Sequence, residues 1–451
     1  MKVGLISLGC AKNLVDSEVM LGALQQAGWT LTDDAQGADV LIVNTCGFID
    51  AAKQESIQTV LDAARLKQHG RCRALIMTGC LAQRYPHALR EQLPGVDAIV
   101  GLNEVPRIAE VIRDVLQTQQ PQLHWSGPAR YVPDYQAPRY RLTPRHYAYV
   151  KIAEGCNHPC TFCSIPRIRG RHRSRPVADV LAEIRDLVAQ GCRELNLISQ
   201  DTTFYGRDLD GGREMLTELL RKIQELPGQF WVRLLYTHPA HWSDGLIRTI
   251  AECDKVCRYV DIPLQHINDE ILHRMKRETD GQYIRELIAR MRAKIPGIAL
   301  RTTFIVGFPG ETEEHFEELL QFLETARFER VGIFTYSQED HTPAGNLPGQ
   351  IPARIKKERY RRAMRLQQRI SREILTRRVG QTIPVLVEEV TGKRWRGRSH
   401  WDAPQIDGCV LGQGTACVGE FVQAKIIAAR EYDLVARTVT VAPSTASFAA
   451  N

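Results

Sequence analysis

The sequence contains no apolar run that approaches the roughly 20 residues of a membrane-spanning helix. Its apolar start, residues 1–9, is followed at once by polar Lys12, Asn13 and Asp16, which is typical of a first β-strand and not of a signal peptide. Without a secretion signal, the twelve cysteines favour metal ligation in a reducing compartment over a disulfide framework. We therefore expect a cytoplasmic protein with no membrane partner.

With 451 residues, of which 43% are hydrophobic, the chain is long enough for two or three domains that each bury a core. Shifts in pattern predict an N-terminal α/β domain, a linker with little regular structure, a second α/β domain, a basic helix, a small β-rich domain and a tail. The expected boundaries of these segments are 1–117, 118–143, 144–350, 351–380, 381–442 and 443–451.

The most specific feature is the motif Cys156-Asn157-His158-Pro159-Cys160-Thr161-Phe162-Cys163. Its three thiolates stand four and then three positions apart, which suits an iron–sulfur cluster. A [4Fe–4S] cluster held by three cysteines has one open iron, and that iron can chelate the amino and carboxylate groups of S-adenosylmethionine (SAM). An electron from the cluster can then split the S–C5′ bond and give a deoxyadenosyl radical. With Phe162 in its aromatic position, the motif resembles the radical-SAM superfamily.

Zinc and disulfides are the alternatives for this motif. Structural zinc usually takes four ligands arranged as CxxC pairs, and that spacing is not present. His158 is available as a fourth ligand, but the following proline and its place between two cysteines make the geometry awkward. We therefore expect Cys156, Cys160 and Cys163 (the motif cysteines) to hold a [4Fe–4S] cluster, with Phe162 beside the cofactor.

A second set of three cysteines follows the predicted strands of the N-terminal domain. Strands alternate with helices over residues 1–117, which indicates a parallel sheet with helices on both faces. Cys10, Cys46 and Cys80 (the strand-end cysteines) each follow a strand in a Gly-containing loop. Because the carboxyl ends of parallel strands share one edge, we expect these cysteines to converge on a second [4Fe–4S] cluster. Separate core cysteines are the alternative.

The strand–helix unit repeats six times between residues 147 and 342, which predicts a partial (βα)6 barrel with its site at the carboxyl ends of the strands. Polar residues that follow the strand predicted at 194–198 are candidates for hydrogen bonds to the methionine amino group or the ribose of SAM. The glycine that follows the strand predicted at 299–306 lets the backbone approach the adenine of SAM. These candidates for binding SAM are Ser199, Gln200, Asp201, Gly307, Phe308 and Pro309.

Other strand-end and loop residues are candidates for the substrate side of the same face. They are His238, Gln265 and His266, together with Arg175 from a basic stretch that follows the motif cysteines. The alternative is that these side chains satisfy strand ends and a solvated turn, because a single histidine or glutamine at a strand end carries little information.

A basic helix is predicted over residues 351–380, with eleven Lys or Arg against two Glu, a net charge of +9. An apolar stripe on this helix suits docking on the barrel, and the basic face suits nucleic acid or a ribonucleoprotein. A solvated basic face is the alternative.

The C-terminal segment, residues 381–442, contains five short strands joined by Gly-rich turns, which predicts a small OB-like barrel. Seven cations balance seven anions over residues 381–440, whereas a barrel that binds phosphates needs an excess of Lys and Arg. We expect the loop with Asp402 and Asp407 to be exposed, and these two carboxylates to bind a basic protein partner.

Nearly the whole chain resembles the methylthiotransferase family, in which a three-cysteine α/β domain and a radical-SAM barrel are followed by a terminal barrel of the TRAM type. Residues 7–18, 261–266 and 403–408 (SLGCAKNLVDSE, DIPLQH and APQIDG) resemble the branch of that family that modifies a ribosomal protein. Ala11 stands where that branch usually has proline, which is a small departure.

The resemblance implies a substrate, an aspartate of small-subunit ribosomal protein S twelve, free or within the subunit, and a β-methylthio product. It implies that the motif cysteines carry the radical-SAM cluster and that the open iron of the strand-end cluster holds the sulfur. One SAM gives the methyl group, a second gives the radical, and an electron donor is required. The alternatives are a tRNA methylthiotransferase acting on the adenosine next to the anticodon, and a non-catalytic iron–sulfur factor that binds RNA or assists assembly.

Overall fold

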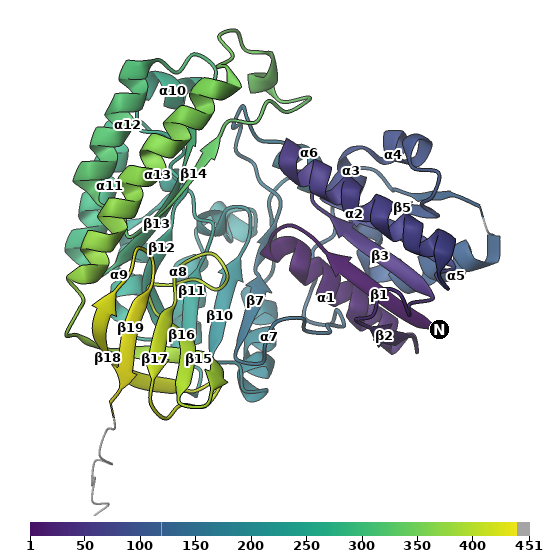
Figure 1. Cartoon of the computed structure of the whole chain (residues 1–451), viewed down its shortest axis with the longest axis horizontal. Coiled ribbons are helices and arrows are strands. Elements are labelled where there is room, and N and C mark those ends of the chain that lie inside the picture. The colour runs from purple at the N-terminus through teal and green to yellow at the C-terminus, as the bar shows by residue number, and fades with distance from the viewer. Residues whose placement is uncertain (119, 440–451) are drawn as a thin grey trace, which may run out of the picture.

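A computed structural model describes residues 1–118 and 120–439, which form three parts (Figure 1). The N-terminal domain (purple to blue) lies beside the central domain (teal to green), and a small C-terminal barrel (yellow) packs against the central domain. This arrangement confirms the predicted fold class. The predicted tail, 443–451, lies outside the described residues.

The N-terminal domain is built on a six-stranded parallel sheet with the strand order β2-β1-β3-β4-β5-β6. Every residue of its two central strands, β3 and β4, is buried, as expected for parallel strands covered on both faces. The strands are β1 (Lys2–Ser7), β2 (Thr30–Thr32), β3 (Val40–Thr45), β4 (Ala74–Gly79), β5 (Ala98–Val100) and β6 (Gln122–His124). The helices are α1 (Ala11–Gln26), α2 (Asp50–His69), α3 (Cys80–Arg84), α4 (Pro86–Gln92), η1 (Leu102–Arg107) and α5 (Ile108–Thr118).

Strand β6 lies in the segment predicted to be a linker with little regular structure, and that prediction is wrong for these three residues. The strand pairs in parallel with β5, with Gln122 opposite Ala98. The short β2 was also missed, because three residues are too few to show a period.

The central domain carries a second six-stranded parallel sheet, with the order β14-β13-β12-β11-β10-β7. Because neighbours in the sheet are successive strands of the repeat, the sheet is the predicted partial barrel. Its strands are β7 (Tyr147–Lys151), β10 (Glu194–Ile198), β11 (Trp231–Leu234), β12 (Val256–Asp261), β13 (Ala299–Val306) and β14 (Arg330–Thr335). A separate hairpin pairs β8 (Ala153–Glu154) with β9 (Arg173–Ser174).

The helices of the central domain cover this sheet, and apolar stripes such as Leu216, Leu219, Leu220 and Ile223 form its core. They are α6 (Ile165–Arg169), α7 (Val177–Ala189), α8 (Leu216–Gln224), α9 (Asp244–Glu252), α10 (Asp269–Arg274), α11 (Gly281–Lys294) and α12 (Glu313–Ala326). Short 3-10 turns follow several strands and helices: η2 (Thr202–Phe204), η3 (Asp210–Gly212), η4 (Pro239–His241) and η5 (Pro343–Asn346).

The predicted basic helix is α13 (Ala353–Thr376), which runs beside α12 in Figure 1 and buries Ala363 and Ile370 in the central core. The C-terminal segment is a closed five-stranded barrel with the order β15-β16-β17-β19-β18. Its strands are β15 (Thr382–Thr391), β16 (Arg394–Ser399), β17 (Val410–Gln413), β18 (Phe421–Ala429) and β19 (Leu434–Thr438).

The C-terminal barrel packs against the amino ends of the central strands. Trp231, the first residue of β11, packs against Phe421 with tilted rings at a centroid distance of 4.6 Å, and Trp401 Nε1 donates to the carbonyl of Gly297, shortly before β13. The carboxyl ends of the strands, where the site is predicted, are therefore left free of the barrel.

Across the part of the chain that the structure describes, none of the helices combines the length and the apolar character that crossing a membrane requires.

Candidate active site between the N-terminal and central domains

The motif cysteines lie in a loop between β8 and α6 that is anchored to the central domain. Thr161 donates its backbone N–H to the carbonyl of Met275 at 3.0 Å and its hydroxyl to the carbonyl of Arg274 at 2.9 Å. None of the three thiols is in a disulfide, and all are partly exposed. Arg277 Nη1 donates to Cys160 Sγ at 3.5 Å, so one cation already faces the sulfur atoms.

Burial and mutual repulsion act on the motif thiols together. Burial, together with the charge of Cys160, raises the pKa of Cys156 to about 12 against the lowering effect of the His158 backbone N–H. Burial and Cys160 likewise raise the pKa of Cys163. Three thiolates this close are stable only beside a strong positive charge, so this donor set fits a cationic iron cluster.

The strand-end cysteines follow β1, β3 and β4, as predicted. Cys10 is the N-cap residue of α1, Cys46 is bound through its backbone to the Ser56 hydroxyl, and Cys80 is the first residue of α3. Gly79 has φ = +94°, and a side chain there would collide with the backbone of Thr45, so only glycine lets β4 turn directly into Cys80. Strands β1, β3 and β4 are neighbours in the parallel sheet, so the three cysteines that follow them lie at one edge of it.

Arg169, the last residue of α6, reaches from the central domain to this second set. Its Nη2 donates to Cys80 Sγ at 3.3 Å and to Asn13 Oδ1 at 2.5 Å. Burial raises the pKa of Cys80 to about 12 against the effect of Arg169. Burial also opposes ionisation of Cys10, but Lys12 and Arg169 outweigh it and lower the pKa of that thiol. Cys10 is solvent-exposed although protein groups surround it, so its thiol can be reached from outside.

A buried charge network fixes the two domains together next to these cysteines. Lys151 Nζ lies 2.5 Å from Asp16 Oδ1 and 2.7 Å from Glu154 Oε2, and Arg169 Nη1 lies 2.9 Å from a carboxylate oxygen of each. Asp16 belongs to α1 of the N-terminal domain, whereas the other three belong to the central domain. All four are under 5% exposed, so each charge depends on the others.

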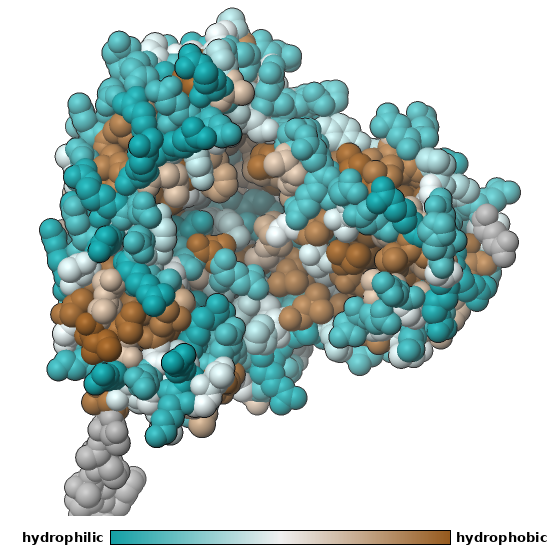
Figure 2. Space-filling model, viewed as in Figure 1, coloured by the Kyte–Doolittle hydropathy of each residue, from teal (hydrophilic) through white to brown (hydrophobic). Residues whose placement is uncertain are grey.

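A second ion-paired contact lies on the other side of the domain interface. Glu339, which follows β14, accepts from Lys53 and from Arg84 at 3.0 Å each, and Arg84 also donates to the carbonyl of Asp340. Figure 2 shows that the surface is hollowed between the N-terminal and central domains. Because Arg169 ends α6, the helix that follows the motif loop, and contacts Cys80, we infer that both cysteine sets open into this hollow, which we call the crevice.

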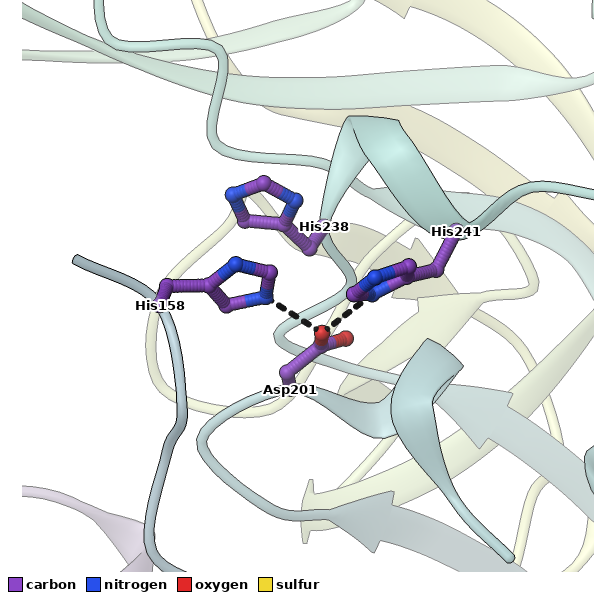
Figure 3. A group of neighbouring side chains, drawn as sticks. All are labelled: His158, Asp201, His238 and His241. Atoms are coloured by element: carbon purple, nitrogen blue, oxygen red, sulfur yellow. Dashed lines mark hydrogen bonds and ion pairs between the residues drawn. The ribbon is translucent and has the colours of Figure 1, made fainter. Parts of the chain in front are cut away.

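A cluster of histidines around Asp201 lies beside the motif loop (Figure 3). His158 Nε2 and His241 Nδ1 each lie 2.8 Å from Asp201 Oδ2, and the ring of His238 stacks on His158 with centroids 3.6 Å apart. The four ligand atoms lie within 4.8 Å of one another, close enough to hold a metal ion, but hydrogen bonds among them already account for this spacing. His158 is thereby fixed within the motif loop.

The predicted SAM-binding residues surround this loop, and some of them have partners within the chain. Asp201 Oδ1 accepts from the backbone N–H of Thr203 at 3.0 Å and of Phe204 at 3.2 Å, so both of its carboxylate oxygens are engaged. The side-chain amide of Gln200 donates to Glu154. Ser199 is buried, with its hydroxyl 3.3 Å from that of Thr202.

The other residues predicted to bind SAM form a mostly buried apolar group with a glycine turn. Phe162 packs against the cluster that contains Phe308 and Tyr336. Gly307 has φ = +73°, and the backbone N–H groups of Gly307 and Phe308 both donate to Glu311. Pro309 is buried in the same turn.

Two of the predicted substrate-side residues are not available to a substrate in this structure, which corrects those predictions. Arg175 is paired with Asp179 and Glu183, at 2.6 and 2.5 Å, and donates to the carbonyl of Lys151. His266 is fully buried, its Nδ1 accepts from the N–H of Asn268, and burial lowers its pKa to about 3. Both side chains hold the central domain together.

The other two predicted substrate-side residues remain close to the carboxyl edge of the sheet. His238 is in the cluster of Figure 3. Gln265 has φ = +74° and is partly exposed, and its backbone pairs with Thr303 and Ile305 of β13. A non-glycine residue held at this φ leaves a strained backbone next to the candidate site.

The prediction that Asp402 and Asp407 bind a partner from an exposed loop is wrong. The Asp402 side chain is paired with Arg330, and Asp407 accepts from the hydroxyl of Tyr259 at 2.6 Å and lies 3.4 Å from Arg301. Both carboxylates are about 2% exposed. They join the C-terminal barrel to the central domain, so they do not supply an acidic outer surface.

Two functional candidates were missed at the level of sequence, Lys12 and Tyr236. Lys12 lies two residues after Cys10, and its Nζ is 2.7 Å from the centroid of the Tyr236 ring, at the end of β11. Lys12 stands in the segment that carried the family resemblance, but no sequence signal shows which strand of another domain it meets. Burial lowers the pKa of Lys12 to about 8.

Comparisons with known proteins agree with this geometry. Family models match residues 2–101 (Uncharacterized protein family UPF0004), residues 150–323 (Radical SAM superfamily) and residues 379–439 (TRAM domain). A protein of Opitutus terrae named ribosomal protein uS12 methylthiotransferase RimO is 53% identical over 456 residues, covering 96% of each chain. Proteins of the same name from Desulforamulus reducens and Geobacter sulfurreducens are each 50% identical, with 96% and 97% of this chain covered and 98% and 99% of theirs.

Solved structures show the same fold at much lower identity. The radical S-adenosylmethionine methyltransferase TsrM from Kitasatospora setae matches with a TM-score of 0.55 and 16% identity, over 76% of this chain and 74% of its own. The cobalamin-dependent radical enzyme OxsB matches with a TM-score of 0.52 and 12% identity, over 81% of this chain and 56% of its own.

Proposed function

The chain belongs to the RimO family of ribosomal protein uS12 methylthiotransferases, and we propose that it modifies a specific aspartate of uS12. It is a radical-SAM enzyme that transfers methylthio groups. In the proposed reaction a methylthio group replaces one hydrogen on the β-carbon of the aspartate. One SAM gives its methyl group and leaves as S-adenosylhomocysteine. A second is cleaved to methionine and a deoxyadenosyl radical, which takes the hydrogen and leaves as 5′-deoxyadenosine.

We propose two [4Fe–4S] clusters, one on the motif cysteines and one on the strand-end cysteines. When bound, the first supplies the electron that cleaves SAM, and the second is the site from which sulfur is delivered. The chain supports the first site through the N–H of Arg277 at Cys160 and through Asp201, which fixes His158 in the motif loop. It supports the second through the N–H of Arg169 at Cys80.

SAM is proposed to lie against the motif loop at the carboxyl ends of the central strands. Phe162 is partly exposed and offers it an apolar surface, which the buried Phe308 supports from behind. The turn at Gly307 and Pro309 is packed against the Lys356 side chain and is proposed to support this surface. Ser199, Gln200 and Asp201 are proposed to shape this site mainly through their contacts within the chain, while His238 and Gln265 face the substrate.

The observation that carries the proposal is the contact between Arg169 and Cys80 across the domain interface. A radical generated at one cysteine set can act only on a substrate atom that is also within reach of the sulfur at the other set. Arg169 Nη2 lies 3.3 Å from Cys80 Sγ, so the helix that follows the motif loop contacts the strand-end set, and this supports one shared reaction space.

We propose that uS12 is met within or near the small ribosomal subunit, and that α13 contacts ribosomal RNA there. Several cations of α13 are committed to α12, among them Arg362, which pairs with Glu313 and Glu317, and Arg369, which pairs with Glu324. The exposed side chains that remain available to bind phosphates are Arg354, Lys357, Arg361 and Arg365. An external electron donor is also required.

The test is a cell that lacks this protein. Mass spectrometry should show uS12 without the methylthio group, while the methylthio content of bulk tRNA stays unchanged. Expression of the intact chain should restore the modification, and expression of Cys10→Ala or Cys156→Ala should not. If the loss appears in tRNA and uS12 is unaffected, the tRNA-modifying alternative is correct.

A further inference from the structure

Lys12 carries a buried positive charge to which the structure gives no carboxylate counter-ion. The residue is 7% exposed, and its ammonium lies against the ring of Tyr236. Within residues 1–118 and 120–439, no carboxylate lies within 4.0 Å of Lys12 Nζ and no acceptor forms a hydrogen bond with it. Lys151, also buried, differs in contacting two carboxylates.

The carboxylates that act on Lys12, Asp261 and Glu154, are already paired with other cations, and the Cys10 thiol beside it is a proposed cluster ligand. Asp261 lies 2.6 Å from Arg301 Nη1 and accepts the backbone N–H of Tyr236 at 2.9 Å. Glu154 is held by Lys151 and Arg169. An unpaired buried cation costs free energy, so an incoming anion at this point removes a penalty as well as adding an attraction.

The surroundings of Lys12 hold it in place for such an anion. Tyr236 has φ = +62°, a conformation that non-glycine residues rarely adopt, and its backbone is fixed by Asp261 and by the N–H of Thr202. This turn presents the tyrosine ring to the ammonium. Lys12 also belongs to the first turn of α1, where the helix dipole adds partial positive charge.

Resting on the function proposed above, we propose that Lys12 binds the side-chain carboxylate of the uS12 aspartate and so selects an acidic substrate. The carboxylate carbon is bonded directly to the β-carbon, so holding the carboxylate places the reacting atom. Lys12 lies two residues from Cys10 of the N-terminal domain and against Tyr236 of the central domain, so this atom is held between the two cysteine sets. A neutral substrate group cannot form the same charge-assisted bond.

The experiment is a double-mutant cycle on binding, with reconstituted holoenzyme and purified uS12. Lys12→Met should weaken binding of wild-type uS12 by about tenfold or more, as expected for loss of a hydrogen bond between charged groups. It should leave unchanged the already weaker binding of a uS12 variant whose target aspartate is asparagine. Lys12→Arg should still bind wild-type uS12 more tightly than the asparagine variant of uS12, by a smaller factor than the parent does.

The matched control is Lys255→Met. Lys255 also lies over an aromatic ring, Phe230 at 4.8 Å, but its ammonium donates to the backbone of Gln224 at the amino edge of the sheet. This variant should bind both forms of uS12 as the parent does. Iron content and SAM cleavage without uS12 should be the same for Lys255→Met as for the parent, and circular dichroism should show that both Lys12 variants are folded.

The outcomes separate this inference from the proposed function. If Lys12→Met weakens binding of the aspartate and asparagine forms by the same factor, or of neither, Lys12 only supports the fold and the inference is wrong, although the parent enzyme still modifies uS12. If the parent enzyme neither binds nor modifies uS12, the proposed function fails and this inference fails with it.

Discussion

Arg169 of the central domain lies 3.3 Å from the sulfur of Cys80 in the N-terminal domain and also contacts Asp16 of the same domain. The Arg169 side chain therefore connects α6, the helix after the motif loop, with the strand-end cysteines and with the buried charge network of the interface. A planar guanidinium can make these contacts at the same time because its donors point in different directions, which a lysine ammonium cannot reproduce.

Replacement of Arg169 should therefore damage both the interface and the second site. Arg169→Met should lower the free energy of unfolding by about 3–5 kcal/mol, because Asp16 and Glu154 lose a buried partner. Arg169→Lys should be intermediate. Denaturant unfolding of the iron-free chain measures the effect, and the surface variant Arg65→Met, whose ion pair with Asp62 is exposed, is the control. Equal stability of Arg169→Met and the parent would refute this reading of the interface.

Iron content tests whether the two cysteine sets are independent sites. Anaerobic reconstitution should load about eight irons per chain, twice the four of one cubane. Replacing the three motif cysteines by alanine should halve the iron and leave the absorption of the other cluster, because the strand-end cysteines lie on separate strands of another domain. The control is Cys72→Ala, since Cys72 is buried in the core of the N-terminal domain. Loss of all iron in the triple variant would argue against two sites.

Removal of one strand-end cysteine should stop methylthio transfer but not the radical cleavage of SAM. Turnover by the parent should yield both 5′-deoxyadenosine and S-adenosylhomocysteine. Cys10→Ala should abolish methylthio transfer while some 5′-deoxyadenosine still forms, because the motif cysteines do not depend on Cys10. Chromatography of the reaction products measures both. A Cys10→Ala enzyme that makes normal amounts of methylthio product would show that sulfur is not delivered from this site.

The contact between the C-terminal barrel and the central domain should respond to pH through Glu194. This fully buried carboxylate lies 2.8 Å from Arg233 Nε and also pairs with Arg398 of β16. Burial opposes its ionisation, but Arg398 and Arg233 outweigh burial and lower its pKa below the ordinary value of 4.5. Since the folded state has the lower pKa, the stabilisation is present above pH 4.5 and is lost as the pH falls below it.

Glu194→Gln should therefore lower the thermal midpoint at neutral pH and flatten its decline in acid. The free energy of unfolding at neutral pH should fall by about 3–5 kcal/mol, because two buried arginines lose their shared partner. Melting curves of parent and variant between about pH 7 and pH 3 measure both effects. Glu389→Gln, which removes a carboxylate of an exposed ion pair with Arg396, is the control and should follow the parent. Parallel curves for parent and Glu194→Gln would contradict this assignment.

The sequence predicted the features that local patterns encode. The strand–helix alternation and the strands before Cys10, Cys46 and Cys80 were sufficient to predict the parallel sheets and the place of these three cysteines after their strands, which the structure shows. The two clusters stay a prediction. Contacts between domains have no local pattern, so the reach of Arg169 to Cys80 and the meeting of Lys12 with Tyr236 could not be predicted.

The errors have the same physical origin. Asp402 and Asp407 lie in a polar, Gly-containing loop, which predicts exposure, but Arg330 and Arg301 from the central domain bury them in ion pairs. Arg175 was assigned to the substrate because it follows a basic stretch, whereas Asp179 and Glu183 on the next helix neutralise it. In each case the deciding partner lies in another element.

The central claim is that this chain methylthiolates uS12 itself. The most direct measurement is mass spectrometry of purified uS12 and of unmodified tRNA after separate anaerobic incubations with reconstituted enzyme, SAM, a reductant and a sulfur source. The account predicts that uS12 gains one methylthio group, located by fragmentation on the β-carbon of a single aspartate, and that tRNA gains none. Methylthio adenosine in the tRNA, with uS12 unchanged, would contradict it.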